Sequence, residues 1–430
     1  MYQNRPPRLH YAWVVAGLTF LILLVSAGVR STPGVLIVPL EREFGWSRAT
    51  ISSAVSVNLL LYGLIGPFAA ALMANLGVRR TVVLSLTVVC AGVALTSLMT
   101  TPWELVLLWG VVVGGGTGMT ALVLGATVVN RWFAERRGLV LGVLTASAAT
   151  GQLVFLPLLA ALIQEHGWRS AVWVVAGAAA LIVPLIALLF RDWPVDVGLR
   201  PYGAKGEVEA RPAVSANPVA VALGGLRDGL RSRDFWLLAG SFFVCGASTN
   251  GLVGTHLIPA CVDQGIPEVR AAALLAMMGL FDLVGTTLSG WLSDRWDNRK
   301  LLCWYYGLRG LSLIYLPFAL GDTGWGLTAF AVFYGLDWIA TVPPTVRLTA
   351  DTFGRARAGI MFGWIVAAHQ IGAAVATLGA GSVRAWMGDY ERAFLTSGAL
   401  CLLTAAMVLQ IGRKRKSAAP GTAVLAGEPA

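Results

Sequence analysis

The stretch Ala74-Asn75-Leu76-Gly77-Val78-Arg79-Arg80 recurs 220 residues later as Asp294-Arg295-Trp296-Asp297-Asn298-Arg299-Lys300. A second stretch, Phe133-Ala134-Glu135-Arg136-Arg137-Gly138, returns at the same offset as Phe353-Gly354-Arg355-Ala356-Arg357-Ala358. Each copy lies between long apolar runs. The chain therefore consists of two related halves, and the offset gives each residue of the first half a counterpart in the second.

Composition places both halves in a membrane. Hydrophobic residues make up 57% of the chain, charged residues only 13%, and the mean hydropathy is +0.72; soluble domains average about 25% charged residues. Twelve apolar runs are each long enough to cross a bilayer as a helix, and too long for barrel strands. These runs are 11–38, 47–73, 79–100, 103–129, 138–164, 168–190, 234–262, 267–292, 299–320, 324–347, 358–385 and 391–411.

The runs predict an all-α membrane protein with twelve transmembrane helices in two pseudo-symmetric six-helix bundles. The first bundle would occupy residues 1–190 and the second 234–412. The polar segment 191–233 predicts a hydrophilic cytoplasmic linker, and 413–430 a cytoplasmic tail. Duplicated halves of this kind are typical of secondary transporters, which hold their substrate between the halves.

The net charge of +10 follows membrane topology. If the N-terminus is cytoplasmic, few basic residues fall in the outer loops, namely Arg42, Arg48, Arg169, Arg270, Arg384 and Arg392. This asymmetry obeys the positive-inside rule with both termini cytoplasmic, and we expect a multi-pass protein of a bacterial cytoplasmic membrane. The run Arg413-Lys414-Arg415-Lys416 would contact anionic membrane lipid. The charge therefore does not indicate a nucleic-acid partner.

Signatures of other protein classes do not occur in the sequence. The five cysteines are scattered, without a CxxC pair or a His-rich cluster, so we expect neither disulfides nor a metal site. A nucleophile elbow and a P-loop are also lacking, which argues against an enzyme and against a cofactor. The linker is short for a folded signalling domain, which disfavours a membrane sensor. We expect the protein to act as a monomer.

One loop motif carries a family resemblance. Gly285-x4-Gly290-Trp-Leu-Ser-Asp294-Arg295-x3-Arg299-Lys300 resembles the motif that joins the second and third helices of a half in the major facilitator superfamily. The resemblance implies that its carboxylate and its basic residues latch the cytoplasmic helix ends. The first-half copy retains Arg79 and Arg80 but has Ala74 in place of the aspartate, so its latch lacks the family carboxylate.

Further stretches are similar to the monocarboxylate and oxalate/formate branch of that superfamily. They are Tyr11-Ala12-Trp13-Val14-Val15, Leu40-Glu41-Arg42-Glu43-Phe44-Gly45-Trp46-Ser47-Arg48, Trp132-Phe133-Ala134-Glu135-Arg136-Arg137-Gly138 and Asp196-Val197-Gly198-Leu199-Arg200-Pro201. The resemblance covers nearly the whole chain. It implies transport of a small organic anion, either with a proton or by exchange.

Arg30 is the expected anion-binding residue. It lies in the first run beside Gly28, Pro33 and Gly34, which loosen a helix. A guanidinium can bind a carboxylate through two hydrogen bonds, and the resembled animal carriers have a lysine at or next to this position. The alternative is an arginine that snorkels toward the outer surface.

Asp282 is the expected proton site, because intramembrane carboxylates commonly belong to proton relays. The resembled carriers have an aspartate here and an arginine four residues on, where this chain has Thr286. The alternative is a permanent ion pair between Asp282 and Arg30. Arg309 and Asp337 form either a structural pair or part of the coupling machinery. His369 is either a proton relay or a neutral packed ring.

The offset pairs polar residues with one another: Arg30 with Asn250, Tyr62 with Asp282 and Thr117 with Asp337. Helices one, two and four would then mirror seven, eight and ten around one cavity. The expected substrate-binding residues are Arg30, Asn58, Tyr62, Gln152, Asn250, Phe281 and Trp338. The expected proton-coupling residues are Asp282, Asp337 and His369.

The leading hypothesis is a secondary transporter of a small organic anion, a monocarboxylate, with proton coupling and alternating access. Anion exchange without net proton coupling is one alternative. Proton-coupled efflux of hydrophobic drugs is another, although the fifth run, Gly142 to Pro157, lacks the Gly-Pro pair common in such antiporters.

Overall fold

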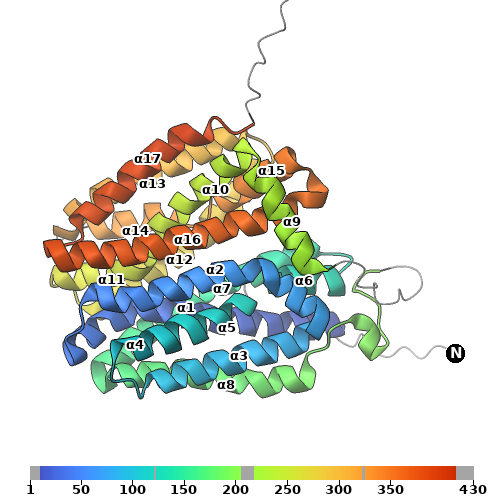
Figure 1. Cartoon of the computed structure of the whole chain (residues 1–430), viewed down its shortest axis with the longest axis horizontal. Helices are drawn as coiled ribbons and strands as arrows, with labels where there is room; N and C mark the ends of the chain where they lie inside the picture. Colours follow the sequence, from blue (N-terminus) through green and yellow to red (C-terminus); the bar gives the residue numbers. More distant parts are fainter. Residues whose placement is uncertain (1–9, 121–122, 205–216, 322–324, 413–430) are drawn as a thin grey trace, which may run out of the picture.

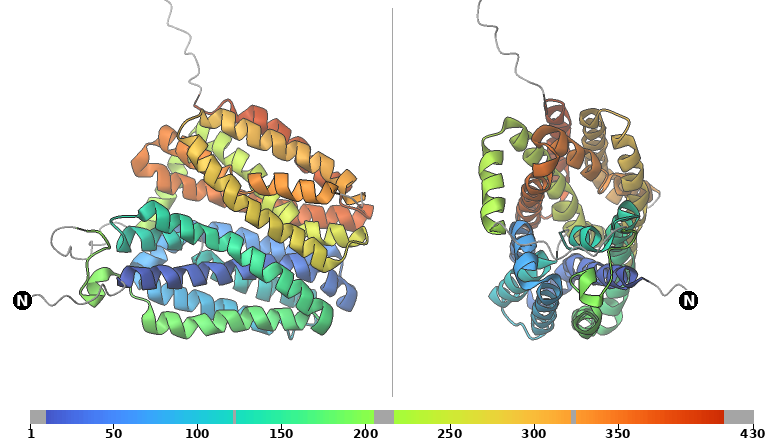
Figure 2. Two further views of the ribbon diagram at one scale, coloured as in Figure 1. Left: turned by 180° about the vertical axis from the view of Figure 1, so that it is seen from behind. Right: turned by 90° about the vertical axis from the view of Figure 1, so that its right-hand side faces the viewer.

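The computed structural model describes residues 10–120, 123–204, 217–321 and 325–412. These residues are almost entirely helical, and the helices form two bundles that lie side by side (Figures 1 and 2). The predicted all-α membrane fold is therefore confirmed. The tail 413–430 and linker residues 205–216 lie outside the described ranges.

The first bundle contains the six predicted spans. They are α1 (Tyr11–Phe44), α2 (Arg48–Leu76), α3 (Val78–Thr96), a composite span of α4 (Pro102–Leu105), η1 (Val106–Val113), α5 (Gly114–Met119) and α6 (Val123–Trp132), then α7 (Arg137–His166) and α8 (Trp168–Leu189).

The second bundle repeats this order. Its spans are α10 (Arg233–Gly246) continuing through η3 (Ala247–Val253) into α11 (Gly254–Asp263), then α12 (Glu268–Ser293), α13 (Asn298–Gly321), α14 (Gly326–Asp337) with α15 (Val342–Phe353), α16 (Arg355–Met387) and α17 (Glu391–Val408).

Eleven of the spans in the described ranges are long and apolar enough to cross a membrane. The remaining predicted span corresponds to α13, whose hydropathy is lowered by Arg309, a tryptophan and three tyrosines. This helix packs between α14 and α17 as part of the second bundle. Polar residues in α13 are thus covered by protein, where a buried charge can be paired.

The first helix is longer than the sequence indicated. The predicted end at residue 38 is wrong, because α1 continues past Pro39 to Phe44. Gly45 ends the helix at φ +67°, in the left-handed region that glycine adopts without strain, and its N–H donates to the Glu41 carbonyl. Residues 39–44 bring Glu41 and Glu43 to the end of the bundle.

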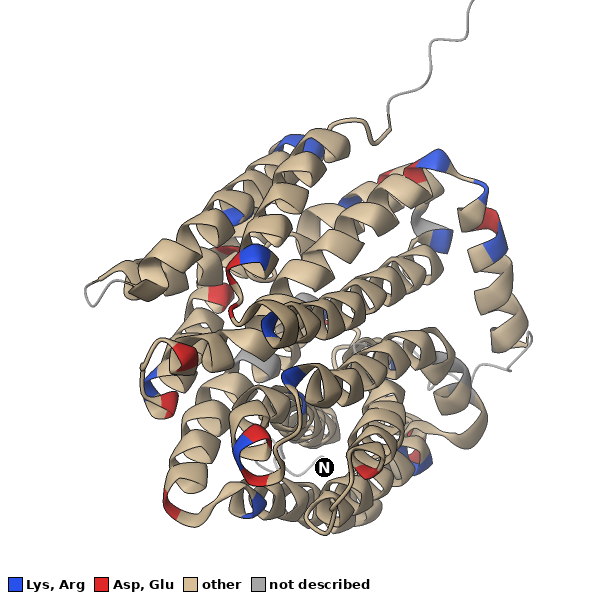
Figure 3. Cartoon of the chain, turned by 60° about the vertical axis from the view of Figure 1, so that its left-hand side comes forward, with Lys and Arg blue, Asp and Glu red and all other residues tan. Residues whose placement is uncertain are grey.

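Charged side chains mark the two ends of the bundles. Figure 3 shows the Lys, Arg, Asp and Glu residues gathered near helix ends, while the helix bodies between them are largely free of charge. The described N- and C-terminal residues lie at one end, here called the terminal end. The other end, where α1 and α11 finish, is called the opposite end.

One span of the second half is interrupted. α14 ends at Asp337 and α15 begins at Val342. Pro343 and Pro344 lie in the first turn of α15, where no N–H is needed.

Two of the stretches that resemble the carrier branch meet at the terminal end of the first bundle, together with Tyr202, the residue after a third. The Trp13 ring lies 5.3 Å from that of Phe133 and 5.7 Å from that of Tyr202, centroid to centroid. Tyr202 also donates its N–H to the Trp132 carbonyl and accepts from the N–H of Ala134. These aromatic contacts tie the start of the linker to α1 and α6.

The linker is more structured than predicted. Residues 191–233 were expected to form a hydrophilic linker, and within it the structure shows η2 (Pro194–Val197) and α9 (Pro218–Leu230). The apolar residues of α9 contact α2, α10 and α16, and the Trp364 indole donates to the Ala222 carbonyl at 2.8 Å. This short helix therefore contacts both bundles at the terminal end (Figure 1).

Gly285 and Gly290 of the loop motif give a matched pair of substitutions. A Cβ at Gly285 would lie 1.8 Å from the Leu336 carbonyl oxygen, whereas one at Gly290 would meet nothing within 4 Å. Gly285→Ala should push α12 from α14 and lower the melting temperature by several degrees, because overpacking costs about 1–3 kcal/mol. Gly290→Ala in the same helix should leave it unchanged. Equal melting temperatures would contradict this packing.

Candidate functional site

The two bundles touch along α2 and α16, along α7 and α12, and where α1 crosses α11. A Cβ at Gly34 would lie 3.1 Å from the Gly254 carbonyl oxygen, so the backbones approach closely. The 220-residue offset relates these two glycines. Arg30 and Asn250 precede them by four residues each, on the corresponding helix faces. The predicted pair thus lies about one turn from the crossing, toward the terminal end.

Arg30 and Tyr62 come together as predicted. The Arg30 guanidinium carbon lies 5.3 Å from the Tyr62 ring centroid, and its Nη1 lies 3.5 Å from the hydroxyl oxygen. Arg30 is half-buried and Tyr62 is buried. Among the described residues, no carboxylate forms an ion pair with Arg30. A cation held by an aromatic face and lacking a counter-ion is a place where an anion can bind.

Asp282 does not pair with Arg30, so the alternative of a permanent ion pair is wrong. Its Oδ1 accepts hydrogen bonds from the Thr286 hydroxyl at 2.8 Å and from the Ile339 N–H at 2.9 Å. The Ile339 N–H is free because α14 has ended two residues earlier. Asp282 is therefore buried among neutral donors, at the break between α14 and α15.

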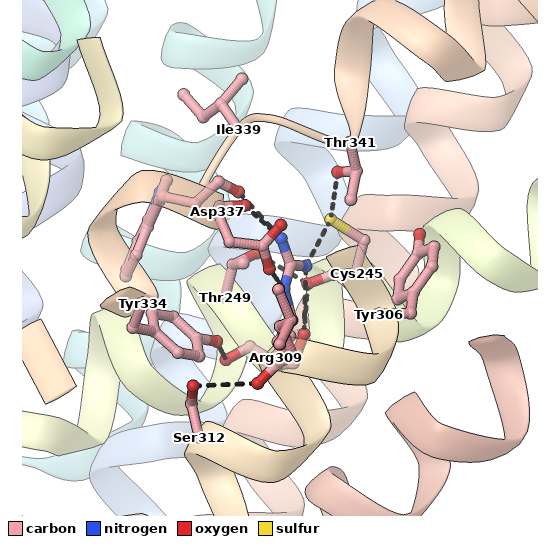
Figure 4. A network of polar contacts seen from close by, with 12 residues as sticks. Cys245, Thr249, Tyr306, Arg309, Ser312, Tyr334, Asp337, Ile339 and Thr341 are labelled. Carbon is pink, nitrogen blue, oxygen red and sulfur yellow. Dashed lines mark hydrogen bonds and ion pairs between the residues drawn. The ribbon is translucent and has the colours of Figure 1, made fainter. Parts of the chain in front are cut away.

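Arg309 and Asp337 form the predicted pair. Arg309 Nε donates to Asp337 Oδ2 at 2.6 Å, and both side chains are almost fully buried. Figure 4 shows the guanidinium of Arg309 between Asp337 and Cys245. Its Nη1 lies 3.0 Å from the Cys245 sulfur, which also contacts the Thr341 hydroxyl.

The same guanidinium also binds the carbonyl groups at the end of α14. Arg309 Nη2 donates to the main-chain carbonyls of Asp337 at 2.5 Å and of Trp338 at 3.3 Å. Carbonyls at a helix C-terminus have no partner within the helix, and a cation satisfies both their hydrogen bonds and the helix dipole. The break in this span thus depends on a charge that α13 provides.

Asn58 lies elsewhere than predicted. Its side-chain amide donates to the Trp109 carbonyl at 2.7 Å, and its Cα lies where a Cβ on Gly114 would come within 2.7 Å. Asn58 therefore holds α2 against η1, and its assignment as a substrate ligand is not supported. The glycine run at 114–116, which lets the backbones approach, was the available signal in the sequence.

The remaining predicted ligands pack against different helices. Trp338 reaches α11, since a Cβ on Gly254 would lie 3.6 Å from its ring. Phe281 packs beside Gly335, where a Cβ would lie 3.1 Å from its own. Gln152 of α7 is half-buried, one residue after Gly151, which packs closely on α1. Trp338 is the one that lies near the crossing.

His369 belongs to packing within the second bundle. Its ring centroid lies 5.1 Å from that of Phe242, and a Cβ on Gly246 would meet its carbonyl oxygen at 1.8 Å. In the described ranges its ring makes no hydrogen bond to Asp282 or Asp337, and its Nδ1 is buried without a hydrogen-bond partner. The contacts match the packed-ring alternative.

The residues of the loop motif in the second bundle have different contact partners. Asp294 accepts from Arg347 of α15 at 3.2 Å, whereas Arg295 lies over the Trp291 ring. Arg299 binds Asp297 through its side chain and its N–H, and the side-chain hydrogen bond from Arg299 holds the pKa of Asp297 below its usual value. Lys300 is exposed.

In the first bundle, the carboxylate at the start of α3 comes from another part of the chain. Asp192, which follows α8, accepts from the Arg79 N–H at 2.7 Å, as Asp297 accepts from the corresponding Arg299. The Arg79 guanidinium also donates to the Ala187 carbonyl of α8, while Arg80 is exposed. The carboxylate that the motif lacks at Ala74 is thus not replaced there, but α3 still has an acidic cap.

A separate pocket of about 540 Å³ lies at the terminal end of the second bundle. Its walls include Asp234, Asp297, Arg299 and Asp351. None of the residues around Arg30 or Asp282 contributes to it, so it is distinct from the candidate site.

The fold agrees with comparisons to known proteins. The profile described as Major Facilitator Superfamily matches residues 19–377 and 257–427. The chain therefore belongs to the major facilitator superfamily, whose relatives below are transporters and not enzymes.

Curated relatives extend over nearly the whole chain. Monocarboxylate transporter 12-B of Danio rerio is 25% identical, over 94% of this chain and 87% of its own length. Monocarboxylate transporter 13 of Rattus norvegicus is 26% identical, over 96% and 91%. The MFS-type transporter YcxA of Bacillus subtilis is 24% identical, over 91% and 92%. The chain is thus a major facilitator transporter related to the monocarboxylate transporters.

Solved structures show the same fold. A bacterial homologue of the human lysosomal transporter Spinster superposes with a TM-score of 0.74 at 16% identity, covering 95% of this chain and 98% of the other. The nucleoside transporter NupG superposes with a TM-score of 0.73 at 13% identity, covering 94% and 100%. At these identities the likeness concerns the architecture of the two bundles.

Proposed function

We propose that this protein transports a small monocarboxylate across the membrane by alternating access, with a proton as the coupling ion. The observation that carries the proposal is Arg30, a half-buried cation within a membrane span that has no ion-pair partner among the described carboxylates. A charge in a bilayer is costly unless it is compensated, and a substrate carboxylate would compensate it. The relationship to monocarboxylate transporters supports the same substrate class.

The ligand would bind where α1 faces η3. Arg30 would bind the carboxylate through two N–H groups, while the Tyr62 ring packs against the guanidinium. Asn250 lies at the corresponding place in the other half and would supply a hydrogen bond. Trp338, beside Gly254, would cover the apolar part of the substrate.

Asp282 is the better candidate for the proton site. Asp337 is bound to Arg309 at 2.6 Å, so its protonation would leave a buried cation uncompensated. Asp282 instead accepts from a hydroxyl and an amide. Because both donors are neutral, a change in its protonation leaves no cationic partner without a counter-ion. We therefore assign Asp337 to the architecture of the break and do not include His369.

Membrane orientation follows the distribution of charge. We place the terminal end in the cytoplasm, because the loops of the opposite end contain few basic residues. The opposite end would then face outward, in the inner membrane of a bacterium. Lipid would contact the outer helix faces, and a monomer is sufficient because both halves are present in one chain.

A thermal-shift screen tests the substrate class. Purified protein would be heated with lactate, pyruvate, formate, oxalate or aromatic carboxylates, and with cationic drugs as the controls. A ligand of the folded state raises the melting temperature by mass action, so one or more monocarboxylates should do so. Stabilisation by cationic drugs alone would contradict the proposal and favour efflux of hydrophobic compounds.

Asp282→Asn tests the coupling. The amide keeps the shape of the side chain but cannot release a proton, so proton-driven accumulation of the carboxylate in vesicles should fall at least tenfold while exchange persists. Glu165→Gln, a change to an exposed glutamate, is the control and should retain accumulation. Loss of exchange together with accumulation in Asp282→Asn would assign the residue to structure instead.

A further inference from the structure

Arg48 joins the two bundles at the opposite end. It begins α2, and only 4% of its side chain is exposed. Its Nη1 donates to Asp263 Oδ2 at 2.8 Å and its Nη2 to Asp263 Oδ1 at 2.6 Å. Asp263 is the last residue of α11, so this two-pronged ion pair links the first half to the second. Parallel hydrogen bonds of this kind are among the stronger ones in proteins.

Each partner of this bridge has a second partner within its own half. Arg48 Nε donates to Glu41 of α1 at 2.9 Å, and both belong to the first bundle. Asp263 Oδ2 accepts from Arg384 of α16 at 2.7 Å, and both belong to the second bundle. The four formal charges sum to zero, and they also sum to zero within each half.

Tyr390 of the second half likewise has one partner in the first half, Arg48, and one in its own half, the neutral His256 ring. Its hydroxyl lies 3.2 Å from Arg48 Nη1 and 3.2 Å from His256 Nδ1. His256 Nε2 lies 2.9 Å from the Thr377 carbonyl, which can only accept. The proton is therefore assigned to Nε2, and the Tyr390 hydroxyl donates to Nδ1. Burial raises the pKa of Tyr390 to about 12, so the hydroxyl keeps its proton at neutral pH.

We propose that these residues form a gate that exchanges partners as the halves separate at the opposite end. Arg48 then gives up Asp263 and Tyr390 and keeps Glu41, while Asp263 keeps Arg384 and Tyr390 keeps His256. Only bonds between the halves break, and no charge is left without a counter-ion. An uncompensated buried charge is strongly destabilising, so Glu41 and Arg384 lower the free-energy cost of opening. The inference rests on the alternating access of the proposed function.

The proposal predicts opposite signs for two groups of neutralised variants. Asp263→Asn removes a bond found only in the closed gate and should favour opening. Glu41→Gln and Arg384→Gln remove partners that matter more in the open gate, where they are the sole counter-ions, and should favour closure. A cluster that merely stabilises one structure would respond with the same sign to all three changes.

Hydrogen–deuterium exchange of the full-length protein in lipid nanodiscs measures this without any substrate. Peptides covering residues 34–44 and 254–263, the ends of α1 and α11 at the crossing, should exchange at least tenfold faster in Asp263→Asn. In Glu41→Gln and Arg384→Gln the same peptides should exchange about threefold more slowly than in the wild type. Arg384→Lys, which keeps the charge, should resemble the wild type.

A nearby ion pair within one half provides the control. Glu43 accepts from Arg169 at 2.7 Å, and both residues belong to the first bundle, so Glu43→Gln should leave exchange at the crossing unchanged. Faster exchange in all three gate variants, or no change in Glu41→Gln and Arg384→Gln, would overturn the partner exchange. Because no ligand is used, such a result leaves carboxylate binding at Arg30 to be judged separately.

Discussion

Arg30→Ala is expected to weaken binding of the stabilising monocarboxylate about 30-fold or more. The Arg30 guanidinium is partly exposed and has no ion-pair partner among the described residues, whereas that of Arg309 is engaged by Asp337. Loss of a charge-assisted, two-pronged contact typically costs about 2–5 kcal/mol in a binding site, and about 1.4 kcal/mol corresponds to tenfold.

The measurement is the dissociation constant of lactate or pyruvate, whichever stabilises the wild type. Arg30→Lys keeps a positive charge but offers no planar fork, and we expect it to lose about tenfold. Tyr62→Phe keeps the ring beneath the guanidinium and removes only the hydroxyl at 3.5 Å, so its loss should be smaller. Unchanged affinity in a folded Arg30→Ala protein would remove this residue from the site.

Arg309→Met is expected to have the largest effect on stability. The substitution leaves Asp337 buried without its cation and frees the carbonyls of Asp337 and Trp338 that the guanidinium satisfies. Breaking a buried ion pair by removing one partner costs about 3–5 kcal/mol, a large part of the stability of most proteins. Thermal unfolding in detergent should show a sharply lowered melting temperature and loss of monodisperse protein.

Two comparisons separate this role from transport. The double variant Arg309→Met/Asp337→Leu removes both charges and should recover part of the lost stability. Arg347→Gln breaks an exposed pair with Asp294 and should alter the melting temperature little. A stable Arg309→Met protein that binds the carboxylate but cannot couple it to protons would contradict the structural assignment and give Arg309 a part in coupling.

Local sequence was sufficient to predict the helices and their division into halves. Apolar runs that can span a bilayer admit few other folds, because a backbone in lipid must satisfy its own hydrogen bonds. The repeat gave the correspondence between Gly34 and Gly254. Arg30 and Tyr62 were brought together correctly because both follow from helix position and pseudo-symmetry.

The errors concern partners that only packing selects. Asn58 was expected to face a substrate, yet its amide satisfies a carbonyl of η1, whose backbone can approach because Gly114 has no side chain. The helix in the linker was missed because α9 is short, and short helices form chiefly through the tertiary contacts that cover them.

The sequence by itself determined the membrane location, the twelve spans, the two halves and the presence of charges within them, because these depend on hydrophobicity, length and repetition. The tertiary structure alone decided which partner each charge takes. Asp282 accepts a hydrogen bond from the Ile339 N–H between α14 and α15. Asp192 accepts from the Arg79 N–H at the start of α3, in the half whose motif has Ala74 in place of an aspartate. Arg48 binds Asp263, 215 residues away in the chain. Pairing of buried charges depends on distances of a few ångströms between helices, and these follow from packing rather than from position in the chain.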